Sequence, residues 1–268
     1  MLLAPRPALE PYSSTPPAGF DGRVIYVEDF RAPNPGVWND GLGSAYRDCD
    51  VMLGGLPTLR LDNQGQTGSG SNPGRTAVTS GVVVKRRIHD GYRGRFGMEF
   101  WFRFTSLFLT AGTTFLSASM YNRDGASAHH ARVWLDPNGN NQPMKGRILD
   151  GAATAVGSGT NPANAATYTD VVTSVQQNGA GSHNYDPNSG RGDRAGGWHW
   201  CKMVVDFATK KYVSLHLDGE FVDLSAYLLD ITDSAGMAGM HHSFEFFATT
   251  GTRPRFLHIG GMVGTLEN

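Results

Sequence analysis

The clearest pattern in the chain is a period-two alternation over residues 96–104, FGMEFWFRF. Successive side chains of a β-strand point to opposite faces, so every second residue shares a face. We expect one face to meet a core, because it carries Phe96, Met98, Phe100, Phe102 and Phe104. The other face mixes charge with aromatic surface, as an open sheet face does, and carries Gly97, Glu99, Trp101 and Arg103.

Shorter runs rich in β-branched and aromatic residues predict further strands. They lie at 24–30, 76–89, 113–120, 131–135, 145–149, 168–175, 243–249 and 255–263. No segment has a sustained apolar stripe of helical period. Residues 225–240 are the one place where we expect a short helix or an irregular loop.

The most regular stretch runs from residue 198 to residue 224. There, WHWCKMVVDF leads through a short turn into YVSLHL. Asp218-Gly219 then has the positive-φ turn chemistry of a tight hairpin, and EFVDL follows it. This order predicts three consecutive antiparallel strands.

Composition agrees with a strand-rich fold. The chain of 268 residues has 35 glycines, 14 prolines and 40% apolar residues, enough for a sizeable core divided by many turns. We expect an all-β, two-sheet antiparallel sandwich of the jelly-roll type over residues 20–268. Within it, residues 150–197 are rich in Gly, Ala and Asn and predict a long surface excursion.

Residues 1–19 are proline-rich and have almost no periodic pattern, which predicts an extended segment. Two interpretations stay open for it. It is either a disordered tail or an arm that becomes ordered against a neighbouring subunit of a homo-oligomer or a larger assembly.

The stretch WHWCKMVVDFATKKYVSLHLDGEFVDL resembles the tryptophan-led strands and Asp-Gly turn of concanavalin-A-like and laminin-G-like jelly rolls. The closing RFLHIGGM is similar to the last strand of those domains, and Glu28-Asp29-Phe30 ends a strand that suits their first. The resemblance implies that the first strand lies near the last. It does not specify an activity, because this fold carries lectins, glycosidases, lyases and virion proteins.

Charge and hydropathy exclude two classes of partner. The net charge is −1 with no run of five or six like charges, which does not fit a nucleic-acid binder. No run approaches the ~20 apolar residues of a membrane span. The amino terminus lacks the apolar stretch of a secretory signal, so we expect the chain to be made in the cytosol. Cys49 and Cys201 are either two free thiols or one bridge.

Glu99 and Glu245 form the candidate carboxylate pair, since both are expected on the face opposite the phenylalanines. Two carboxylates on neighbouring strands have the spacing that glycosidases use. Trp101 and Phe247 flank them, and Arg103 lies two residues from Trp101. The same residues also suit glycan binding without catalysis, because exposed aromatic rings and polar neighbours bind sugars. Trp134 is a further candidate ring.

Asp136, Asn138 and Asn140 place oxygen atoms at alternate positions, as calcium loops do. Asp-Pro and Asn-Gly are also ordinary turn sequences, and no bidentate Glu ends the loop. We therefore expect a turn and no cofactor, with calcium as the weaker alternative.

Three functions fit these observations. The first is a non-catalytic structural protein of a large assembly, such as a virion decoration or minor tail protein, with glycan-binding capacity. The second is a carbohydrate-binding module. The third is a polysaccharide hydrolase or lyase that uses Glu99 and Glu245, although neither of the fold's usual acidic or lyase motifs is present.

Overall fold

The protein is an all-β molecule, as predicted. A computed structural model describes residues 23–31, 44–62, 80–89, 94–104, 114–124, 127–136, 144–151, 168–175, 198–218, 220–232, 239–248 and 256–267. These ranges contain fifteen strands in two antiparallel sheets, and no helix. In the same ranges, no helical segment is present that has the length and apolarity to cross a membrane.

The first sheet, sheet A, has eight strands. In spatial order they are β12 (Glu220–Asp223), β11 (Lys211–Leu217), β10 (His199–Asp206), β5 (Arg95–Phe104), β15 (Phe256–Glu267), β3 (Leu56–Asp62) and β2 (Ser44–Leu53), with β1 (Arg23–Glu28) also paired to β15. The pairing of β1 with β15 confirms that the first strand lies beside the last.

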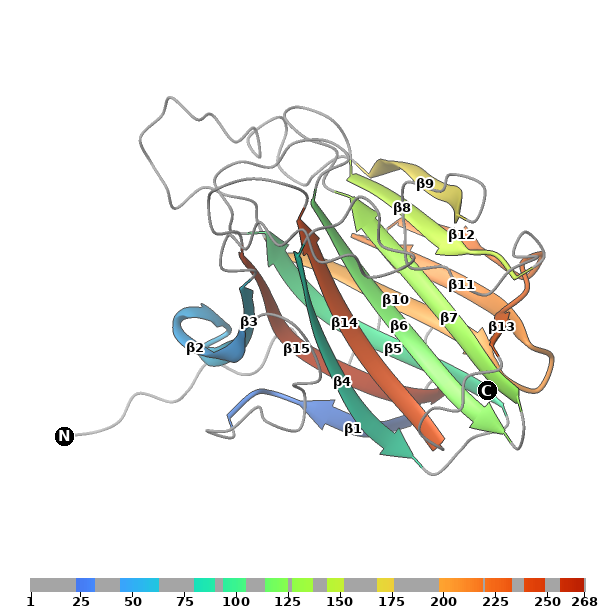
Figure 1. The fold of residues 1–268 in the computed structure, drawn as a ribbon, viewed down its shortest axis with the longest axis horizontal. Coiled ribbons are helices and arrows are strands. Elements are labelled where there is room, and N and C mark those ends of the chain that lie inside the picture. Colours follow the sequence, from blue (N-terminus) through green and yellow to red (C-terminus); the bar gives the residue numbers. More distant parts are fainter. Residues whose placement is uncertain are drawn as a thin grey trace.

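The second sheet, sheet B, has seven strands. In order they are β4 (Ser80–His89), β14 (Gly239–Ala248), β6 (Thr114–Asp124), β7 (Ser127–Asp136), β8 (Met144–Leu149) and β9 (Tyr168–Val175), with β13 (Asp230–Thr232) paired to β7. In Figure 1, β14, β6 and β7 cross in front of β5, β10 and β15, so the two sheets form two layers.

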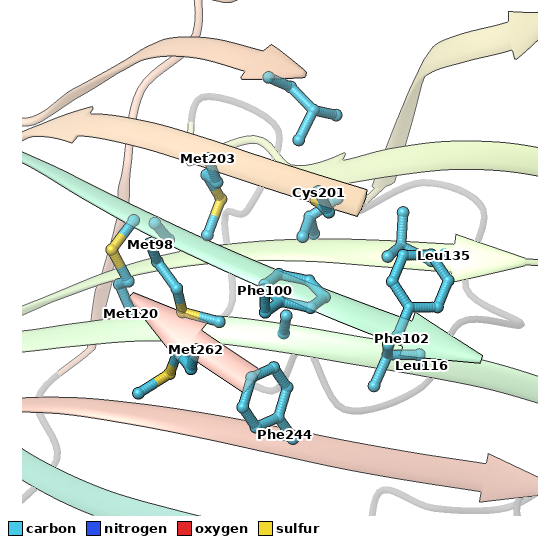
Figure 2. Close-up of a cluster of buried hydrophobic side chains, with 14 of the residues drawn as sticks. Met98, Phe100, Phe102, Leu116, Met120, Leu135, Cys201, Met203, Phe244 and Met262 are labelled. Atoms are coloured by element: carbon cyan, nitrogen blue, oxygen red, sulfur yellow. The ribbon is translucent and has the colours of Figure 1, made fainter. Parts of the chain in front are cut away.

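The core lies between the inward faces of the sheets (Figure 2). Phe100 of β5 meets Phe244 of β14 edge-on, with ring centroids 5.1 Å apart. Burying a side chain of this size stabilises the fold by about 1.5–3 kcal/mol. Tyr212 of β11 also joins the layers, because its hydroxyl donates to the Leu149 carbonyl at 2.7 Å and accepts from the Arg132 amide at 2.9 Å.

The predicted three-strand ladder is confirmed. β10 pairs with β11, and β11 pairs with β12 from Leu217 opposite Glu220, which leaves a two-residue turn between them. Asp218 has a φ of 50°, the left-handed conformation that such a turn requires.

Two parts of the fold were not predicted. The hairpin of β2 and β3 turns at Gly54 and Gly55, both at positive φ, and a bulge between Asp48 and Met52 hides its alternation. Residues 225–240 were expected to be a helix or a loop, but residues 230–232 form β13 and β14 starts at Gly239. The segment 1–19 and most of the excursion at 150–197 lie outside the described residues.

Candidate functional site

The alternation predicted for β5 is confirmed. Its phenylalanines and Met98 are buried, whereas Glu99, Trp101 and Arg103 are partly exposed on the outer face of sheet A. These three predicted site residues therefore share one surface.

Trp101 has aromatic neighbours on the adjoining strands. Trp200 of β10 lies directly opposite it. The Trp200 and His216 ring centroids are 6.0 Å apart, and those of His216 and Phe221 are 4.7 Å apart. Trp101, Trp200 and His216 are partly exposed and Phe221 is 61% exposed, so the four rings form an accessible row, called here the aromatic row.

A cluster of charged side chains adjoins the aromatic row. Lys202 of β10 is fully buried, and its Nζ lies 2.6 Å from Glu267 Oε1 of β15. Glu99 lies directly opposite Lys202, and its Oε1 accepts a hydrogen bond from Trp200 Nε1 at 2.9 Å. Thr265 donates a further hydrogen bond to Glu267. The buried ammonium is thus paired, as a charge out of water must be.

Gly97 makes room for this cluster. A Cβ at position 97 would lie 2.3 Å from Thr265 Oγ1, 2.6 Å from Glu267 Oε1 and 3.0 Å from Lys202 Cε. A side chain there would push the Lys202–Glu267 pair apart, so glycine is the residue that this geometry accepts.

Burial shifts the pKa values of Glu99, which adjoins the aromatic row, and of His216, which belongs to it. It raises the pKa of the Glu99 carboxyl above 4.5, although the Trp200 hydrogen bond and the Lys202 charge oppose the change. Burial also lowers the pKa of His216 below 6.5, and the Lys202 charge lowers it further. At neutral pH His216 is therefore an uncharged aromatic ring.

Arg103 lies at the other flank of Trp101, opposite His258 of β15. The imidazole of His258 is hydrogen-bonded through Nε2 to Asp48 Oδ2 at 2.9 Å, and Arg60 lies 3.7 Å from the same carboxylate. Burial lowers the pKa of His258 despite the Asp48 carboxylate. These contacts hold β2 and β3 against β15 at the margin of the surface.

Glu245 lies elsewhere, so the expected carboxylate pair is wrong. It belongs to β14 of sheet B and alternates with the inward Phe244 and Phe246, which places it on the outer face of the opposite layer. Glu99 and Glu245 therefore point away from each other on the two sides of the sandwich. Period-two alternation predicted that both face outward, but not in which sheet.

The outer face of sheet B is polar but buried. Glu245 Oε1 lies 3.5 Å from the Arg132 guanidinium, and Glu245 is 6% exposed. Trp134 of β7 is 1% exposed. Within the part of the chain that the structure describes, Ser117 Oγ, Ser119 Oγ and Glu245 Oε2 are buried without a hydrogen-bond partner.

Phe247 lies in β14 opposite Phe115, and its side chain is outside the described residues. Asp136 is the last residue of β7, whereas Asn138 and Asn140 lie beyond the described ranges. In those ranges no group of His, Cys, Asp and Glu side chains has the arrangement of a metal site. Cys49 and Cys201 are both free thiols.

No family model and no curated protein sequence matches the chain. Among solved structures, it is similar to a carbohydrate esterase of the Shiga toxin-encoding bacteriophage phi24B, at a TM-score of 0.53 and 10% identity over 92% of this chain and 100% of that one. The carbohydrate recognition domain of Emp47p has a TM-score of 0.49 and 11% identity over 95% and 100% of the two chains. The fold is an all-β jelly-roll sandwich of two antiparallel sheets.

Proposed function

We propose that this protein binds glycans through the aromatic row on the outer face of sheet A. The observation that carries the proposal is the row itself. Four rings, from Trp101, Trp200, His216 and Phe221, lie on four neighbouring strands and are accessible from solvent.

The chemistry of the surface suits a sugar. The faces of aromatic rings bury the apolar C–H faces of pyranose rings, and a few fixed polar groups orient the hydroxyls. Glu99 is one such fixed polar group. It lies opposite Lys202, and its carboxylate accepts a hydrogen bond from the Trp200 indole. A held carboxylate can accept sugar hydroxyls without losing much side-chain freedom on binding.

The bacteriophage protein that shares the fold is described as a carbohydrate esterase, which supports carbohydrate as the ligand class. Binding without hydrolysis is the favoured activity, because the hydrolase alternative depends on Glu99 and Glu245 forming one pair. Those two carboxylates lie on opposite outer faces.

Isothermal titration with cellohexaose, maltohexaose, xylohexaose and chitohexaose tests the proposal. We expect at least one to bind, and Trp200→Ala and Trp101→Ala each to weaken it by about 5- to 10-fold, since an aromatic contact contributes ~1 kcal/mol. Trp134→Phe, on the buried face of sheet B, is the matched control and should bind as the native chain does. Equal loss in all three variants, or no binding at all, contradicts the proposal.

A role as a virion decoration or minor tail protein is a second, separate proposal. It is supported by the proline-rich segment at 1–19 and by a fold shared with a bacteriophage protein along that protein's whole length. Density-gradient fractionation of native material, with mass spectrometry of this chain, tests it. A fixed ratio to a large particle supports an assembly role through the arm, and sedimentation at monomer size contradicts it.

A further inference from the structure

β1 (Arg23–Glu28) is an edge strand of sheet A. Among the described residues it pairs with one strand, β15, and it lies at the lower margin of the molecule in Figure 1. We propose that its outer edge pairs with β1 of a second copy of the chain, antiparallel and about a two-fold axis, so that the two A sheets join into one. The aromatic row contains no residue of β1, so this proposal does not depend on glycan binding.

The sequence of β1, RVIYVE, is complementary to itself when one copy is reversed. An antiparallel pair centred on the middle of the strand places Arg23 of each copy opposite Glu28 of the other. Val24 of each copy then lies opposite Val27 of the other. Opposite charges and apolar side chains that meet across strands each stabilise the pairing, and the two-fold axis doubles every such contact.

A bulge in β1 brings the two valines onto a common face. The register with β15 shifts between Val24 and Tyr26, so that Val24 lies opposite Thr265 and Val27 lies opposite Val263. Thr265 and Val263 are two positions apart on β15 and point to the same side of the sheet, so the valines do as well. In a regular strand, residues three positions apart point to opposite faces and cannot meet across an antiparallel pair.

The charged residues at the two ends of β1 share the other face, because their partners on β15 are four positions apart. Arg23 is exposed. The Glu28 carboxylate is held in place, since it accepts hydrogen bonds from the Tyr26 hydroxyl at 2.9 Å and from the Phe30 amide at 3.0 Å. A carboxylate that is already fixed loses little side-chain freedom when it binds a guanidinium.

The middle of the strand exposes apolar surface. Val24 and Val27 are 54% and 51% exposed. Proteins commonly protect an edge strand with a central charge, a proline or a bulge that turns the edge away. β1 has charges only at its two ends, where self-pairing uses them, and its bulge aligns the two valines.

Sedimentation equilibrium from about 1 µM to about 1 mM tests the proposal. The parent chain carries Cys49→Ser, because Cys49 is an exposed free thiol that could link two copies. We expect a reversible equilibrium of monomer and dimer. Arg23→Glu and Glu28→Arg each place like charges opposite each other twice and should weaken the dimer by about 10-fold. A mixture of these two variants pairs glutamate with arginine at both ends and should restore the affinity as a heterodimer.

Disulfide trapping tests the register. Val24→Cys and Val27→Cys are made separately in the Cys49→Ser parent, and oxidation of their mixture should cross-link far more chain than oxidation of either alone. Residues paired across antiparallel strands lie within the ~5.5 Å between Cα atoms that a disulfide spans, whereas identical positions are about 10 Å apart along the strand. Far-ultraviolet circular dichroism checks that each variant is folded.

Three results would overturn the proposal. The first is a parent chain that stays monomeric over the whole concentration range. The second is a dimer that neither charge reversal weakens, and the third is cross-linking that is equal in like and unlike pairs. The last two would show that the copies associate through another surface.

Discussion

The outer faces of the two sheets carry similar residue types in different surroundings. On sheet A, Trp101 and Trp200 are partly exposed and Glu99 is hydrogen-bonded. On sheet B, Trp134 and Glu245 are only 1% and 6% exposed, and one oxygen of Glu245 has no hydrogen-bond partner among the described residues. A polar, aromatic outer face is thus not a binding surface by composition alone. What matters is whether its rings are accessible and its charges are already paired.

The ion pair on sheet A is also shorter than the one on sheet B. The Lys202–Glu267 contact on sheet A is 2.6 Å, whereas the Arg132–Glu245 contact on sheet B is 3.5 Å. We therefore expect substitutions on sheet A to break a well-formed network, and hydroxyl removal on sheet B to have little effect or to stabilise.

The largest expected effect comes from Lys202→Met. It leaves Glu267 buried without its counter-ion, which should lower the free energy of unfolding by about 3–5 kcal/mol. Urea unfolding measures this change. The double variant Lys202→Met with Glu267→Gln removes both charges and should recover most of the loss. Equal losses in the single and double variants would show that the pair is not what stabilises this face.

Gly97→Ala should cause the second-largest loss of stability. The new Cβ would lie 2.3 Å from Thr265 Oγ1 and 2.6 Å from Glu267 Oε1, and overpacking of this kind costs about 1–3 kcal/mol. Gly146→Ala in sheet B is the matched control, because its nearest atom, Val172 Cβ, lies at 3.2 Å. Thermal and urea unfolding should show the larger loss at position 97, and the reverse order contradicts the account of the cluster.

Trp200→Phe should change the pH dependence of sheet A. The ring stays, but the hydrogen bond to Glu99 is lost, at about 1 kcal/mol, and the pKa of Glu99 rises further. A raised pKa in the folded state adds stability below about pH 4.5, the usual value, and this stability disappears as pH rises through the folded pKa. In Trp200→Phe the pKa of folded Glu99 is higher, so the decrease in the free energy of unfolding should extend to higher pH than in the native chain.

Titration of Glu99 by carbon-detected NMR, together with unfolding from pH 3 to pH 8, measures both changes. Trp101→Phe is the control, because Glu99 accepts its indole hydrogen bond from Trp200. An unchanged Glu99 titration in Trp200→Phe would contradict the assigned contact.

The smallest effect, of opposite sign, is expected on sheet B. Ser119→Ala removes a buried hydroxyl that has no partner among the described residues, so it should be neutral or stabilise by up to ~1 kcal/mol. Thr265→Val on sheet A removes a hydroxyl that donates to Glu267 and should destabilise by ~1 kcal/mol. If urea unfolding ranks Ser119→Ala as the more harmful change, the contrast between the faces is wrong.

Much of the fold could be predicted from local pattern. The alternation of β5 identified its core face, and Asp218 marked the turn between β11 and β12. The bulged hairpin of β2 and β3 could not be predicted, because an irregular register breaks the period-two pattern.

The candidate site could be predicted only in part. Glu99, Trp101 and Arg103 do share a surface, since residues i and i+2 of one strand always do. Trp200 and Lys202 were missed because their neighbours on β5 depend on long-range register, which the residues of β10 alone do not encode. Glu245 was misplaced for the same reason, because alternation distinguishes inward from outward but not one sheet from the other.

The most direct test of glycan binding on sheet A uses the indole N–H signals of the five tryptophans in a ¹⁵N-labelled chain. Signals are assigned with single Trp→Phe variants and followed during titration with each of the four hexasaccharides. We predict that at least one hexasaccharide shifts the signals of Trp101 and Trp200 on sheet A and leaves that of Trp134 on sheet B in place. Shifts confined to Trp134, or no shift with any of the four, would contradict the account.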